Sequence, residues 1–128
     1  MRILLDTHAL LWWWGEPHLL SKQANSLMAQ PENQILVSSA SAWEVATKVR
    51  LGKLPNAKDA VPNWLEWVSE DGFTTLPINS AHALRAGSLL REHRDPFDRM
   101  LAAQAVIENV TLLTKDPALR RLGADTLW

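Results

Sequence analysis

The sequence contains no cysteine and no tyrosine among its 128 residues. The absence of cysteine excludes a disulfide scaffold and a thiolate zinc site, and it is compatible with a reducing cytoplasm. No apolar run approaches the roughly 18 residues that would span a membrane, and the N-terminus lacks the pattern of a secretory signal. The chain is therefore predicted to be a cytoplasmic protein with no membrane association.

A strong charge of one sign is also lacking. The 13 lysines and arginines nearly balance the 14 aspartates and glutamates, for a net charge of −1. Strong non-specific binding to nucleic acid is therefore not expected, although an enzyme can still handle nucleic acid through a local basic rim and metal ions. Apolar residues make up 47% of the chain, as is typical of a globular protein, and we expect one domain covering residues 1–128.

Short apolar runs alternate with helical patterns along the chain. Strands are predicted at residues 3–5, 35–37, 73–76 and 111–114, with a final edge strand at 126–128. Spacing and capping signals predict helices at residues 7–14, 21–28, 40–51, 60–69, 80–91, 96–108 and 117–123. This alternation predicts an α/β domain, with a central parallel sheet of four to five short strands flanked by helices.

Several of the predicted helices start with capping patterns. Ser21 suits an N-cap, and the segment from Ser41 to Glu44 has the form of a capping box. Asp95-Pro96 and Asp116-Pro117 each join a favoured N-cap residue to a favoured first helical residue. These patterns predict where four of the helices begin.

Four acidic residues occupy one kind of position, at strand ends or helix starts. They are Asp6 after the first strand, Glu44 in the first turn of the helix after the second strand, Asp98 in the first turn of the helix from residue 96, and Asp116 after the fourth strand. Each one alone has a structural explanation, as a turn residue, a capping-box member, a helix-dipole partner or an N-cap. In a parallel sheet, however, all these places share one edge, and capping does not require convergence. We therefore expect the four carboxylates to lie close together.

Converging carboxylates have a physical consequence. Two unit charges about 4 Å apart repel by roughly 4 kcal/mol at an effective dielectric of about 20, so such a cluster must protonate, separate or hold a cation. An all-oxygen site suits Mg²⁺ or Mn²⁺, and the chemistry that it favours is metal-assisted phosphodiester hydrolysis. Asp98 is assigned to the metal and Asp95 mainly to capping, because Pro96 makes Asp95 the N-cap.

Four stretches of the chain carry a resemblance to a known family: LLDTH at residues 4–8, VSSASAWEVATK at 37–48, RDPFDRMLAAQA at 94–105 and LTKD at 113–116. Together they resemble PIN-domain ribonucleases, and more closely the VapC-type toxins of bacterial toxin–antitoxin pairs. The resemblance implies a Rossmann-like PIN fold with the first strand central, and Mg²⁺- or Mn²⁺-dependent endoribonuclease activity on RNA. It also implies a homodimer, and a hetero-oligomer with a cognate VapB-type antitoxin that covers the acidic pocket.

The same resemblance assigns the acidic residues. The family's catalytic and metal-binding quartet matches Asp6, Glu44, Asp98 and Asp116. Of these, Asp6 and Asp98 are the expected direct ligands, and the role of Asp116 varies most within the family. Thr7 matches a hydroxyl position near the metal.

Basic residues near these acids are candidates for contacts with RNA. Lys48 follows Glu44 by one helical turn, and Arg94 and Arg99 flank Asp98. The alternatives are an i,i+4 ion pair for Lys48 and solvated helix-start charges for the two arginines. His8 and His93 also lie near the proposed edge and are candidate general bases, although metal-bound water can perform that task itself.

Seven tryptophans are present, three of them consecutive at residues 12–14. These three cannot all face one side of a helix, so at least one is expected to be exposed or held by a partner. Together with Trp43 they are candidates for an antitoxin groove or a dimer surface, although core packing is the favoured interpretation for Trp43.

Other functions fit the sequence less well. A phosphohydrolase with an aspartyl nucleophile usually needs a second acid two residues later, where His8 stands. A phosphoacceptor receiver domain needs an acid pair at the first strand and an aspartate ending the third, where Thr75-Leu76-Pro77 stands instead. The remaining alternative is a catalytically silent PIN-like protein-binding module, against which the intact quartet argues.

Overall fold

A five-stranded parallel sheet forms the centre of the computed structural model, which describes residues 1–90 and 93–128. The strands are β1 (Arg2–Leu5), β2 (Gln34–Ser38), β3 (Thr74–Leu76), β4 (Thr111–Leu113) and β5 (Thr126–Leu127). Their order is β3-β2-β1-β4-β5, so β1 is central and β3 and β5 are the edges. All neighbouring strands are parallel. The predicted α/β class, the number of strands and the central position of the first strand are confirmed.

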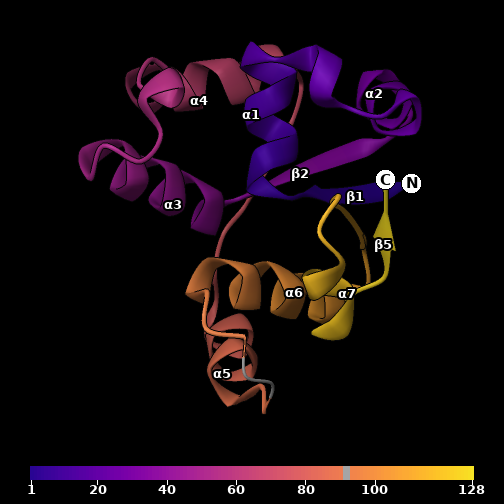
Figure 1. Cartoon of the computed structure of the whole chain (residues 1–128). Helices are drawn as coiled ribbons and strands as arrows, with labels where there is room; N and C mark the ends of the chain where they lie inside the picture. The colour runs from indigo at the N-terminus through magenta and orange to yellow at the C-terminus, as the bar shows by residue number, and fades with distance from the viewer. Residues whose placement is uncertain (91–92) are drawn as a thin grey trace.

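Helices cover both faces of this sheet (Figure 1). One face carries α1 (Thr7–Gly15), α2 (Lys22–Ala29), α3 (Ser39–Arg50) and α4 (Ala60–Glu70), and the other carries α5 (Ser80–Ser88), α6 (Pro96–Glu108) and α7 (Pro117–Arg121). Two short 3₁₀ turns, η1 (Pro17–Leu19) and η2 (Pro55–Ala57), were not predicted. No helix within the described ranges is long and apolar enough to cross a membrane.

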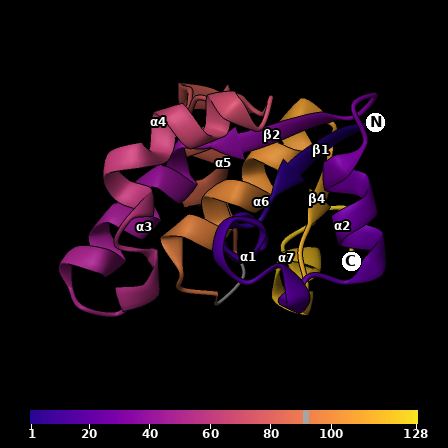
Figure 2. The ribbon, with the colours of Figure 1, turned by 90° about the horizontal axis from the view of Figure 1, so that it is seen from above.

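After the exposed Arg2, the strand β1 is apolar and buried, with helices on both of its faces. Ile3, Leu4 and Leu5 are at most 1% exposed. Ile3 and Leu5 join the core cluster under α1 to α4, whereas Leu4 joins the cluster under α6 and α7. Figure 2 shows β1 and β2 running alongside each other toward the side of the molecule where α1 and α3 begin. The carboxyl ends of the strands therefore point to one common edge.

The start of α3 differs from the prediction. The helix begins at Ser39, and its N-cap is Ser38, whose hydroxyl accepts a hydrogen bond from the Ala40 N–H at 3.0 Å. The predicted capping box at Ser41–Glu44 is therefore wrong. The helix starts earlier than predicted because of the length of β2. This strand pairs with β3 as far as Ser38, and the chain then turns directly into the helix. Glu44 consequently lies in the second turn of α3 and not in the first.

Three further expectations are corrected by the structure. Trp43 is 60% exposed and contacts Phe97 edge-on at 4.9 Å, so the prediction of core packing is wrong. The buried face of α3 consists of Ala40, Ser41, Glu44 and Val45, which leaves position 43 on the outer side of the helix. The third strand begins at Thr74, one residue after the predicted start at Phe73. The helix α5 ends at Ser88, before the predicted end. The predicted helix end at Arg91 lies outside the described residues.

The three consecutive tryptophans are all partly buried, and each packs on a different aromatic partner. The ring centroid of Trp12 lies 5.7 Å from that of Trp128, that of Trp13 lies 5.9 Å from Phe73, and that of Trp14 lies 5.1 Å from Trp64. The run therefore divides its side chains among several neighbours, as the geometry of a helix requires.

Candidate active site

Asp6 directly follows the central strand, as predicted. Its backbone N–H donates to the Leu113 carbonyl oxygen at 3.0 Å, which extends the pairing of β1 with β4. Its side chain forms no capping bond to α1. Instead, the Thr114 hydroxyl donates to Oδ2 of Asp6 at 2.7 Å and accepts a hydrogen bond from the Asp116 N–H at 3.0 Å. This hydroxyl therefore connects the end of β1 to the turn after β4.

Glu44 reaches the same edge from the buried face of α3 and is only 4% exposed. Its carboxylate forms an ion pair and hydrogen bond with Lys48 one turn later, as the i,i+4 alternative predicted. Burial alone would lower the pKa of Lys48, but the hydrogen bond and charge of Glu44, with the charges of Asp95 and Asp98, raise this pKa above its usual value. Lys48 is therefore cationic at neutral pH.

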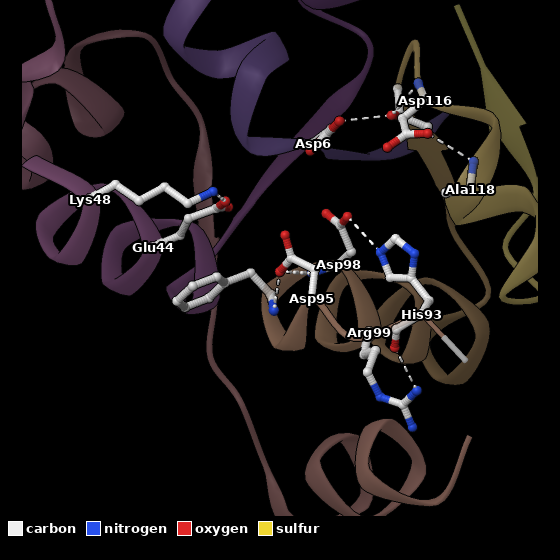
Figure 3. A network of polar contacts seen from close by, with 11 residues as sticks. Asp6, Glu44, Lys48, His93, Asp95, Asp98, Arg99, Asp116 and Ala118 are labelled. Atoms are coloured by element: carbon white, nitrogen blue, oxygen red, sulfur yellow. Dashed lines mark hydrogen bonds and ion pairs between the residues drawn. The ribbon is translucent and has the colours of Figure 1, made fainter. Parts of the chain in front are cut away.

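Asp98 is presented by the first turn of α6. Asp95 is the N-cap, and its Oδ1 accepts hydrogen bonds from the N–H groups of Phe97 at 2.9 Å and Asp98 at 3.3 Å. The predicted role of Asp95 as the N-cap of α6 is thus observed. The Asp98 side chain points toward Asp6, and its Oδ2 lies 2.9 Å from Nε2 of His93 (Figure 3).

Asp116 is the N-cap of α7, with its Oδ1 accepting a hydrogen bond from the Ala118 N–H at 2.9 Å. Figure 3 shows its other carboxylate oxygen turned toward the space shared by Asp6 and Asp98. Capping and membership of the acidic cluster are therefore not exclusive for this residue.

The four acids come together from four different elements. One pocket of about 470 Å³ is lined by all of them and by further polar and aromatic side chains: Asp6, Glu44, Asp98 and Asp116, with His8, Trp12, Lys48, Asp95, Lys115 and Trp128. The expected convergence at the carboxyl edge of the sheet is thus observed.

Burial dominates the electrostatics of this pocket. The pKa of Asp6 is raised, first by burial and also by the charge of Glu44, against the lowering effects of the Thr114 hydrogen bond and His8. The pKa of Asp98 is raised to about 6, mainly by burial and also by the charges of Asp95 and Asp6, against the lowering effects of the hydrogen bond and charge of His93. Both carboxyls therefore resist ionisation when no cation is present.

The donor set fits a hard divalent cation. The carboxylates supply only oxygen ligands, and Mg²⁺ commonly binds through one or two carboxylates together with water and phosphate oxygens. Within residues 1–90 and 93–128, no group of three or more histidine, aspartate and glutamate side chains stands ready to chelate a metal ion. Thr114, Lys48 and His93 hold three of the carboxylates instead. A cation would therefore have to exchange with some of these contacts.

Three residues predicted to contact substrate are not among the described residues that line the pocket. Thr7 is 2% exposed, and its hydroxyl lies 2.8 Å from the Ser41 hydroxyl. The Arg99 guanidinium donates to the carbonyl oxygens of Ala86 at 3.0 Å, Leu89 at 2.6 Å and His93 at 3.0 Å. Arg94 is exposed. Of the four predicted substrate contacts, only Lys48 lines the acidic pocket.

Sequence reasoning missed three residues that the structure places at or beneath the site. Thr114 orients Asp6, Ser41 ties α3 to Thr7 at the start of α1, and Lys115 lines the pocket as a second lysine. Thr114 and Lys115 lie within the LTKD stretch, which was the available signal. The contacts of Thr114 with Asp6 and of Ser41 with Thr7 join residues far apart in the chain, so no local pattern predicts them.

Comparison with known proteins places the whole chain in one family. The sequence model of the PIN domain matches residues 3–125. The chain belongs to the PIN-domain family. Ribonuclease VapC22 of Mycobacterium tuberculosis (strain ATCC 25618 / H37Rv) is 31% identical over 121 residues, covering 92% of this chain and 89% of that protein.

Solved structures support the same fold for this PIN domain. A chain of VapBC2 from Rickettsia felis, bound to a DNA fragment from its promoter, matches with a TM-score of 0.71 at 20% identity and covers 99% of this chain and 98% of that chain. FitAcB from Neisseria gonorrhoeae matches with a TM-score of 0.67 at 19% identity, with 98% and 96% coverage. The PIN fold expected from the sequence is therefore confirmed.

Proposed function

We propose that this PIN domain is a metal-dependent endoribonuclease and the toxin of a toxin–antitoxin pair. The observation that carries the proposal is the convergence of Asp6, Glu44, Asp98 and Asp116 in one pocket at the carboxyl edge of the sheet. The name of the relative, Ribonuclease VapC22, supports RNA as the substrate. Mg²⁺ or Mn²⁺ is the proposed cofactor, since the pocket offers oxygen donors and buried negative charge.

Asp6 and Asp98 are the proposed direct ligands, and Glu44 and Asp116 support them from α3 and α7. A cation held by these residues would supply activation of water and neutralisation of the charge that develops on the phosphodiester. The Thr114 hydroxyl fixes the orientation of Asp6. Lys48 keeps its charge at neutral pH and lines the same pocket, so it can approach a phosphate oxygen of the RNA. Hydrolysis then adds water across one P–O bond of the backbone.

The protein partners are inferred from the structural relatives. The solved structures similar to this chain include VapBC2 from Rickettsia felis and VapBC-1 from nontypeable Haemophilus influenzae. We therefore propose a VapB-type antitoxin as the inhibitor of this PIN domain, within a hetero-oligomer, and a homodimer for the free toxin. Light scattering on the purified protein, alone and with the product of a neighbouring small reading frame, measures both assemblies.

RNA cleavage with added Mn²⁺ tests the proposed activity. The wild-type protein should cleave cellular RNA at discrete sites, and EDTA should abolish the cleavage. Asp6→Asn removes one charge from the proposed metal site and should reduce cleavage to background. Asp125→Asn is the matched control, because Asp125 is an exposed carboxylate outside the pocket, and it should cleave like the wild type.

Persistent cleavage by the Asp6→Asn protein, with the Asp125→Asn preparation showing that purification adds no nuclease, would contradict the proposal. If neither the wild-type protein nor any variant cleaves RNA, while the wild-type protein binds the antitoxin tightly, the result would instead support a catalytically silent protein-binding module.

A further inference from the structure

The acidic pocket is bordered by a row of aromatic side chains that phosphodiester hydrolysis does not itself require. His8 and Trp12 come from α1, and Trp128 follows β5. The ring centroids of His8 and Trp12 are 5.8 Å apart, and those of Trp12 and Trp128 are 5.7 Å apart. All three line the same pocket as the carboxylates. His8 is exposed and the two tryptophans are partly exposed, so the row is accessible from solvent.

A second cavity, of about 620 Å³, continues from this row between α1, η2 and α4. His8 and Trp12 line both cavities, so they stand at the boundary between them. The walls of the second cavity include Trp14, Pro55 and Trp67. A chain that places one of its bonds at the carboxylates therefore has an aromatic surface immediately beside that bond.

The charge of the acidic pocket limits the ways in which it can hold RNA. Five acidic side chains line the pocket against two lysines: Asp6, Glu44, Asp95, Asp98 and Asp116 against Lys48 and Lys115. This excess of negative charge repels a phosphate backbone. Stacking of a base on an aromatic ring does not depend on a favourable charge balance, and it is available only to bases that are not paired in a helix.

We propose that the aromatic row of His8, Trp12 and Trp128 is a stacking platform for an unpaired base next to the cleaved phosphodiester. This inference rests on the proposed ribonuclease function and specifies which side chains hold a base at that same site. Trp12 is the central residue, because it contacts both other rings and borders both cavities.

Binding of labelled RNA, measured by fluorescence anisotropy in EDTA so that no cleavage occurs, tests the platform. The probes are a short unstructured RNA, the same RNA in a duplex, and a strand of equal length in which the bases are removed. The wild-type protein should prefer the unstructured RNA. Trp12→Ala should weaken that binding by about 5- to 150-fold, which is the range expected for loss of one base–aromatic stack, and should not change the binding of the abasic strand.

Two further substitutions separate stacking from packing, because Trp12 also packs against the core. Trp12→Phe retains an aromatic face and should retain most of the affinity. Trp12→Leu retains apolar bulk without an aromatic face and should bind as weakly as Trp12→Ala. Trp43→Ala is the matched control, since Trp43 is an exposed tryptophan outside the acidic pocket. Thermal unfolding confirms that each variant is folded.

Equal affinity of the wild-type, Trp12→Leu and Trp12→Ala proteins for unstructured RNA would overturn the inference, as would equal wild-type affinity for the intact and abasic strands. Unchanged RNA binding with loss of antitoxin binding would also overturn it and would assign the row to protein docking. The two proposals fail separately. If the Trp12 variants bind and cleave RNA in Mn²⁺ as well as the wild type does, the ribonuclease proposal stands and the stacking platform is rejected. If RNA binding depends on Trp12 but no cleavage occurs, the stacking platform stands and the ribonuclease proposal is rejected.

Discussion

Three of the carboxylates in the acidic pocket are each held by a different protein donor. Thr114 donates to Asp6, Lys48 pairs with Glu44, and His93 contacts Asp98. These contacts fix the directions of the side chains, but they do not offset the cost of burying the carboxylates, because the pKa values of Asp6 and Asp98 remain raised. A site of this kind gains stability when a cation takes part of the charge.

The pH dependence of stability should reveal the raised pKa of Asp98. Burial is the main cause that raises the pKa of this carboxyl from 3.8 to about 6, so the folded state binds its proton more tightly than the unfolded state does. The resulting stability is fully present below about pH 4 and is lost as the pH rises through about 6. In EDTA, Asp98→Asn should therefore melt close to the wild type at about pH 4 and increasingly above it toward pH 7.

Thermal unfolding of both proteins across that range measures the difference in melting temperature. The other carboxyls are present in both proteins, so this difference reports the titration of Asp98 together with its coupling to Asp6, Asp95 and His93. A difference that does not change with pH would contradict the raised pKa.

At the scale of elements, the site depends on how helices begin. The Asp-Pro starts of α6 and α7 were predicted from the sequence because capping is a local interaction between a side chain and amides two or three residues away. The start of α3 was misplaced because it depends on how far β2 pairs with β3, which is not a local property. Glu44 reaches the pocket all the same, since it shares the inner face of α3 with Val45.

Substitutions of Asp95 separate the capping effect from the electrostatic effect at the start of α6. Asp95→Ala removes the acceptor for the Phe97 and Asp98 N–H groups and should lower the unfolding free energy by roughly 1 kcal/mol. Asp95→Asn keeps an acceptor and should stay close to the wild type. Both substitutions remove a charge that raises the pKa of Asp98, so both should lower that pKa.

Urea unfolding measures the stability of the two variants, and NMR titration of the Asp98 carboxyl measures its pKa. Equal loss of stability in Asp95→Ala and Asp95→Asn would show that capping by residue 95 is not what stabilises the start of α6.

At the scale of the whole molecule, the order of the strands brings the carboxylates of the pocket together. Placing β1 between β2 and β4 brings the end of β1 next to α3 on one side and α7 on the other. The alternation of strands and helices was sufficient to predict a parallel sheet with acids at one edge. It was not sufficient to predict the Thr114 contact to Asp6, which joins residues 108 positions apart, or the exposure of Trp43, which depends on which face of α3 meets the sheet.

The central claim is that the gathered carboxylates form one divalent-cation site, and calorimetric titration with Mn²⁺ tests it most directly. The wild-type protein should bind Mn²⁺ with a measurable heat, and the control Asp125→Asn should bind it equally well. Asp6→Asn and Asp98→Asn, which remove charge from two different elements of the pocket, should each abolish detectable binding. Wild-type affinity in either of these two variants, or no binding by the wild-type protein, would contradict the account.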